Sequence, residues 1–189
     1  MFYELFQQTQ EHKKLINALS GKGASALFGL PAAGRAQVYA ALSRELDRPL
    51  CVVTPGEAEA TRFAADLNTM GVPAAVFPAR DYVLRPIEGT AREYEYRRLA
   101  VLGDLVGGRL QAVCVPVEGL TQFTTPKEDF CRNTRTLRPG DTLPREELNT
   151  MLLDAGYVRR DRVEGPGQFS IRGDILDLYT PEMKSPVRV

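Results

Sequence analysis

The stretch ASALFGLPAAGRAQVYAALSREL, residues 24–46, decides the fold of the first part of the chain. Its opening residues, Ala24–Phe28, form an apolar run of strand length, and Arg35–Leu46 has the composition of a helix. Gly29 and Gly34 lie in the loop between the two. The order predicts a strand, a glycine loop and a helix, which is the repeating unit of an α/β domain.

The two glycines have the spacing of a phosphate-binding loop, G-x-x-x-x-G-K-[ST]. Arg35 stands where that pattern has lysine, and Ala36 stands where it has the hydroxyl that holds magnesium. Alanine cannot bind magnesium, and Pro31 removes a backbone donor from the loop. We therefore expect a degenerate phosphate loop at Gly29, Gly34, Arg35 and Ala36, without ATP hydrolysis.

Two alternatives remain open for this loop. In the first, the glycines simply turn the chain between a strand and a helix and have no link to phosphate. In the second, a residual anion site persists at the helix N-terminus with help from Arg35.

Strands and helices alternate on both sides of the loop, and we assign residues 1–117 to one α/β domain. The expected helices are Leu5–Leu19, Gly56–Met70 and Gly89–Val106, and the further expected strands are Leu50–Thr54, Ala74–Phe77 and Ala112–Val117. The short connections predict a P-loop-NTPase-like, mostly parallel sheet with helices on both faces.

The pattern changes after about Val117, and residues 118–189 are predicted to form a small α+β second domain. Its expected elements are a polar strand at Cys131–Leu137, a helix at Pro144–Ala155, a hairpin of Tyr157–Val163 with Phe169–Tyr179 around Gly165-Pro166-Gly167, and a strand at Val187–Val189. The chain stops within an apolar pattern, so we expect the domain to be truncated at its C-terminal end.

Composition excludes several classes of protein. The 24 basic and 24 acidic residues balance, so the chain has no global charge of the kind that drives nonspecific binding to nucleic acid. Its apolar runs are of strand length, too short to span a membrane, and Met1–Gln10 lacks the pattern of a secretory signal. We expect a cytoplasmic protein.

Histidine and cysteine are sparse. His12 is the only histidine, on an expected solvated helix face, which argues against a metal site or a Ser-His-Asp triad. Cys51, Cys114 and Cys131 lack CxxC spacing and are expected to be reduced, as small buried hydrophobic residues.

A resemblance to known proteins comes from GQFSIRGDILDLY, residues 167–179. It is similar to the signature G-x-F-x-x-R-G-D/G-x-x-D-x-F/Y shared by bacterial transcription-repair coupling factors and the excision-repair protein UvrB. Residues 155–159, AGYVR, resemble the turn that precedes this signature in the coupling factors. The coupling factors are also resembled by Phe77-Pro78 and, after a charged stretch, Arg97-Arg98-Leu99. UvrB keeps the lysine and hydroxyl that Arg35 and Ala36 replace, so the chain resembles the coupling factors more.

The resemblance implies an N-terminal UvrB-like module that is inactive as an ATPase and recruits UvrA to RNA polymerase stalled at DNA damage. It also implies that UvrA recognises the small second domain, whose surface the full protein keeps masked. ATP, magnesium, RNA polymerase and double-stranded DNA would be bound by motor and polymerase-binding parts absent here, and this segment would need no cofactor. Residues 77–89 look too short for the hairpin that UvrB inserts into DNA. The alternative is a DNA- or nucleotide-binding module of a UvrB-like, helicase-like enzyme.

Five residues are the candidate contacts with UvrA. By motif position, Arg159 and Arg172 match arginines shared with UvrB, and Tyr179 is the aromatic residue that ends the signature. Arg160 and Arg162 extend a basic cluster beside Arg159. Arginine suits a polar interface because its guanidinium forms bidentate, charge-assisted hydrogen bonds.

Each candidate has a structural alternative. Alternation along 169–172 places Arg172 on the exposed side of a strand, where it could instead pair with Asp174 or Asp177. Arg160 and Arg162 could form an ordinary solvated face, and Tyr179 could belong to the core. Gly173 is expected to permit a bulge or a close backbone approach.

Overall fold

The computed structural model describes residues 6–21, 24–46, 48–80, 92–138 and 140–189. The chain divides into two compact units, Met1–Ala79 with Gly107–Gln122, and Arg80–Val106 with Phe123–Val189. Helix α5 (Arg92–Val106) therefore groups with the second unit. The domain boundary predicted near residue 117 stays a prediction.

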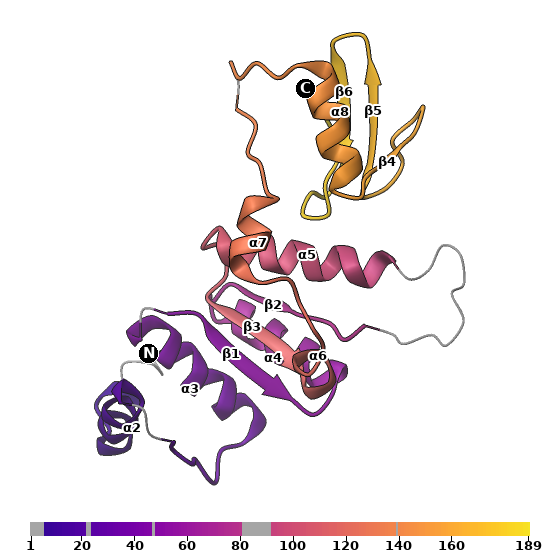
Figure 1. Cartoon of the computed structure of the whole chain (residues 1–189). Helices are drawn as coiled ribbons and strands as arrows, with labels where there is room; N and C mark the ends of the chain where they lie inside the picture. The colour runs from indigo at the N-terminus through magenta and orange to yellow at the C-terminus, as the bar shows by residue number, and fades with distance from the viewer. Residues whose placement is uncertain (1–5, 22–23, 47, 81–91, 139) are drawn as a thin grey trace. The chain divides into compact units, whose positions relative to one another are not determined.

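The first unit contains a parallel three-stranded sheet in the order β1-β3-β2 (Figure 1). The strands are β1 (Leu50–Thr54), β2 (Ala74–Val76) and β3 (Ala112–Pro116). Val52 of β1 and Val76 of β2 both pair with Cys114 of the central strand β3. The strands predicted at Leu50–Thr54, Ala74–Phe77 and Ala112–Val117 and their parallel arrangement are confirmed.

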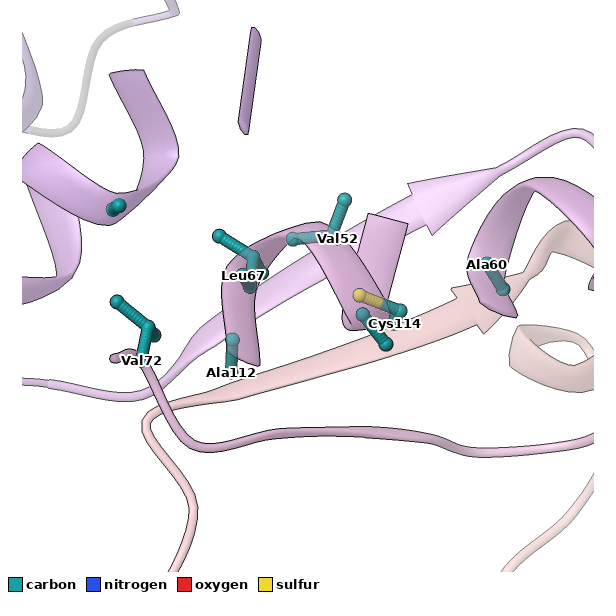
Figure 2. Packing of buried hydrophobic residues seen from close by; sticks show 8 residues of the cluster. Val52, Ala60, Leu67, Val72, Ala112 and Cys114 are labelled. Carbon is teal, nitrogen blue, oxygen red and sulfur yellow. The ribbon is translucent and has the colours of Figure 1, made fainter. Parts of the chain in front are cut away.

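Helices flank this sheet, as the α/β pattern predicted. They are α3 (Ala32–Glu45), α4 (Glu57–Thr69) and the short α6 (Val117–Leu120), whereas α2 (Gln10–Ser20) packs on α3. The core between helices and sheet, shown in Figure 2, contains the buried residues Val52, Ala60, Leu67, Val72, Ala112 and Cys114. Ala60 and Ala64 are the small side chains that α4 contributes to this cluster.

The strand predicted at Ala24–Phe28 is wrong, because these residues are exposed and belong to no strand. Phe28 is 91% exposed. A strand requires hydrogen bonding to a neighbour, and none of the described strands pairs with this segment. Its composition alone was therefore not sufficient to place it in the sheet.

The second unit contains a mixed four-stranded sheet and helix α8 (Arg145–Asp154). The strands follow in the order β4 (Val158–Arg159), β5 (Gln168–Arg172), β6 (Ile175–Tyr179) and β7 (Val187–Arg188). The buried cluster of Leu152, Phe169, Ile171 and Leu176 joins α8 to one face of the sheet. The predicted helix and last strand are confirmed.

Two predictions for the second unit are wrong. The strand expected at Cys131–Leu137 is replaced by α7 (Lys127–Arg132) and irregular backbone. Pro126 before the helix and acidic residues in its first turn favour that helix start. The hairpin is also misplaced, since β4 runs parallel to β5 and the antiparallel pair is β5 with β6.

The tight turn of the observed hairpin lies at Gly173 and Asp174. Gly173 has φ +61°, a conformation that glycine adopts without strain. Its role is therefore to turn the chain rather than to form a bulge. The first residues of the helix expected at Gly89–Val106, and most of residues 77–89, lie outside the described part of the chain.

Candidate docking surface

Helix α8 covers one face of the sheet of the second unit, and the candidate contact Arg172 lies on the opposite face. Phe169 and Ile171 point toward α8 and are buried, whereas Arg172 lies on the other side with its side chain 62% exposed. Ser170 is two residues before Arg172 in β5, so it lies on the same side of the sheet. Asp177 pairs with Ser170 and therefore also lies on that side. Arg188 pairs in turn with Asp177. We call this side, with Arg172, Ile175, Asp177, Tyr179 and Arg188, the open face.

An ion-pair network lies at the centre of the open face. Arg188 donates to Asp177 from Nε to Oδ1 at 2.6 Å and from Nη2 to Oδ2 at 3.0 Å. Arg172 donates from Nη2 to Oδ2 of the same carboxylate at 2.8 Å. Hydrogen bonds from Arg188 and then Arg172 lower the pKa of Asp177 from 3.8 to about 2, and the carboxylate raises the pKa of Arg188.

This network has a chemical consequence for binding. Two guanidinium groups share one carboxylate, so the cluster carries a net positive charge. Each guanidinium has five N–H donors, and Asp177 engages only some of those of Arg172 and Arg188. The carboxylate therefore holds both arginines in place while leaving donors for an acidic partner.

The intramolecular alternative for Arg172 is thus observed, with Asp177 rather than Asp174 as the partner. It does not exclude docking, because the side chain remains exposed. Arg188 was not among the contact residues predicted from the sequence. Its signal was the strand predicted at Val187–Val189, but only the strand register shows that it reaches Asp177.

Tyr179 is half-buried at the end of β6. Its hydroxyl donates to the backbone carbonyl of Lys184 at 3.0 Å, across the loop that joins β6 to β7. Tyr179 pairs with Gln168, so its side chain lies on the open face, at the last residue pair of strands β5 and β6. The residue has a clear structural role, and a contact with UvrA stays a prediction.

Arg159 lies on the side opposite to Arg172. It pairs with Phe169, whose side chain points toward α8, so the two predicted contact arginines do not share a face. Its Nη2 is 3.5 Å from the carbonyl of Ile171. The guanidinium lines a cleft of about 530 Å³ between β4 and α8, bordered by Arg145, Glu146, Asn149, Thr150, Arg159 and Ile171. We call it the α8 cleft.

Arg160 and Arg162 are exposed in the segment that follows β4. The backbone N–H of Arg160 donates to the carbonyl of Phe169 at 2.9 Å. Neither side chain forms an ion pair within the described ranges. Their exposure agrees with a solvated face, and a docking role stays a prediction.

The segment predicted to be a degenerate phosphate loop lies at the start of α3. Gly29 has φ +78°, and α3 begins at Ala32, so Gly34 and Arg35 lie in the first helical turn. The amide of Arg35 donates to the carbonyl of Pro31 at 3.0 Å. Arg35 is exposed, whereas Ala36 is fully buried against the core. The position of the missing hydroxyl thus faces protein.

The structure corrects the environment of two other residue types. His12 is buried rather than solvated, and its Nε2 lies 2.9 Å from Oε1 of Glu45, on the neighbouring helix. The three cysteines are free, as predicted, but only Cys114 is buried.

No group of three or more metal-ligating side chains occurs among the described residues. In the same part of the chain, no helix has the length and apolar character needed to cross a bilayer.

Comparison with known proteins supports the expected relationship. Residues 136–189 match the family described as the UvrB interaction domain. The chain is 28% identical to the transcription-repair-coupling factor of Bacillus subtilis, over 97% of this chain and 16% of that protein. The corresponding protein of Mycobacterium bovis is 32% identical over 98% and 16%, and that of Staphylococcus aureus is 24% identical over 94% and 15%. The chain spans about a sixth of the length of these curated relatives.

Proposed function

We propose that this chain, a transcription-repair coupling factor module, is a protein-docking segment that recruits UvrA to RNA polymerase stalled at DNA damage in the cytoplasm. The observation that carries the proposal is the coincidence of two features. The match to the UvrB interaction domain covers α8 and the whole sheet of the second unit. The open face of that sheet presents arginines already held in place by Asp177.

The open face fits recognition of an acidic protein surface. Arg172 and Arg188 are 62% and 64% exposed at their side chains, and Ile175 adds an exposed apolar contact beside them. Fixing arginine side chains before binding reduces the entropy lost in the complex. A partner carboxylate could therefore bind the remaining N–H groups without displacing Asp177.

The proposal assigns no reaction to this segment. The loop at Gly29 and Gly34 lacks the lysine and hydroxyl of a working phosphate site, and Ala36 is buried. ATP hydrolysis, movement on DNA and release of the polymerase would then depend on other parts of a longer protein. This segment would contribute recruitment alone.

Isothermal titration of the chain with purified UvrA tests the proposal. We expect wild-type binding, and a loss of about 2 kcal/mol for a hot-spot residue in Arg172→Ala or Arg188→Ala. Arg62→Ala is the matched control, since Arg62 is an exposed, ion-paired arginine of the first unit. Absence of wild-type binding would refute the proposal. Equal weakening in Arg62→Ala would point to general charge attraction instead.

A further inference from the structure

The edge of the second sheet offers a binding site distinct from the open face. β4 is one of the two edge strands of this sheet and contains only Val158 and Arg159. The amide of Val158 donates to the carbonyl of Gly167, just before β5, and the amide of Arg160 donates to the carbonyl of Phe169 in β5. The N–H and C=O of Arg159 therefore point away from the sheet. An edge strand with outward-pointing peptide groups is a template for another strand.

The α8 cleft lies against this same residue. Its floor includes the buried side chain of Ile171, and its walls come from β4 and from the N-terminal half of α8. A groove between an edge strand and a helix suits an extended peptide, which can bond to the strand through its backbone and insert alternate side chains into the groove. The volume of about 530 Å³ can hold a few side chains.

The charges around the cleft select the kind of peptide. Arg145 and Arg159 line it against one acid, Glu146, so the lining carries a net positive charge. Asn149 also lines it, and its buried Oδ1 has no hydrogen-bond partner in the described part of the chain. A carboxylate with a neighbouring N–H donor would complement these groups, and an acidic peptide supplies both.

We propose that the α8 cleft binds an extended, acidic segment of the docking partner by adding it as a fifth strand beside β4. This inference rests on the proposed function for the identity of the partner. Backbone bonds to the N–H and C=O of Arg159 would set the register. The guanidinium groups of Arg145 and Arg159 would bind a carboxylate of the added strand, and a second side chain would lie over Ile171.

The test combines affinity with amide exchange in the complex with UvrA. Thr150→Trp fills the cleft from an exposed position on α8, and we expect at least tenfold weaker binding. Glu146→Gln removes the one acidic side chain of the lining, so we expect it to bind more tightly than wild type. In the wild-type complex the amide of Arg159 should exchange more slowly than in the free chain.

The outcomes separate this inference from the proposed function. Wild-type affinity in Thr150→Trp, or unchanged exchange at Arg159 in the complex, would overturn strand addition while leaving recruitment intact. No binding by the wild-type chain would overturn both. Thermal unfolding of Thr150→Trp establishes that it is folded, and Arg145→Glu provides a second variant that should weaken binding without filling the cleft.

Discussion

Arg159 and Arg172 lie on opposite faces of one sheet, although the sequence predicts both as contacts for the same partner. Arg159 pairs with Phe169 and lines the α8 cleft. Arg172 belongs to the open face, where it binds Asp177. A partner that uses both must therefore meet the sheet on one face and also at its β4 edge.

This separation predicts additive effects on UvrA binding. Arg159→Ala and Arg172→Ala remove side chains that share no side-chain partner among the described contacts. The free-energy loss in the double variant should equal the sum of the single losses within about 0.5 kcal/mol. Titration of the four proteins measures this sum. A coupling well above that value would show that one partner group contacts both arginines.

The Asp177 network predicts how stability depends on pH. The folded-state pKa of about 2 lies below the usual 3.8, so the folded state binds fewer protons than the unfolded state between these values. The stabilisation is complete above about pH 4 and is lost as the pH falls through about 2. Denaturant unfolding of wild type and Asp177→Asn should therefore differ most near neutral pH. A difference that grows on acidification would contradict the network.

Gly167 is predicted to be the glycine of the second unit least tolerant of substitution. It has φ +75°, and the ring and hydroxyl of Tyr96 occupy the space that a Cβ would need. Gly167→Ala should cost more than the roughly 1–2 kcal/mol of a positive φ alone. Thermal or denaturant unfolding measures the loss.

Gly156→Ala is the control for that experiment. Gly156 has a similar φ of +83°, but no atom of the described chain lies within 4 Å of the place that a Cβ would take. The stability lost in Gly156→Ala should therefore reflect backbone strain only. Adding Tyr96→Ala to Gly167→Ala should recover the excess. Equal losses in the two glycine variants would show that Tyr96 does not restrict this position.

The burial of Ala36 predicts that introducing the lysine and hydroxyl of a phosphate loop does not create ATP binding. In Arg35→Lys combined with Ala36→Thr, the new hydroxyl would enter the core, where Ala36 has no exposed surface. We expect no heat of binding with ATP and magnesium, and a destabilisation of about 1–3 kcal/mol from overpacking. Arg35→Lys alone, at an exposed site, should be neutral. Gain of ATP binding in the double variant would contradict this account.

Local patterns predicted the elements that depend on their own residues. Leu50–Thr54 forms β1 as expected because its apolar, β-branched side chains fit the pleated surface of a half-buried strand. Helix α8 follows Pro144 and has acids in its first turn, both local signals. The side of the sheet on which Arg172 lies followed from the alternation along β5, although Ser170 on that side is buried and donates its hydroxyl to the carbonyl of Asp161.

The failures concern partners distant in the chain. Ala24–Phe28 has strand composition but no neighbouring strand among the described ones. The parallel pairing of β4 with β5 placed Arg159 toward α8, and only the register of β7 showed that Arg188 reaches Asp177. Burial of His12 likewise depends on Glu45 of another helix. Such pairings cannot be obtained from spacing within one segment.

Amide hydrogen exchange along the whole chain, measured with and without UvrA, is the strongest single test of docking by the second sheet. We expect protection on binding to be concentrated in residues 158–188, at β4 and along the strands of the open face. The first unit, including α3 and the loop at Gly29–Gly34, should exchange at the same rate in both samples. Protection confined to the first unit would contradict the claim that the second sheet is the docking surface.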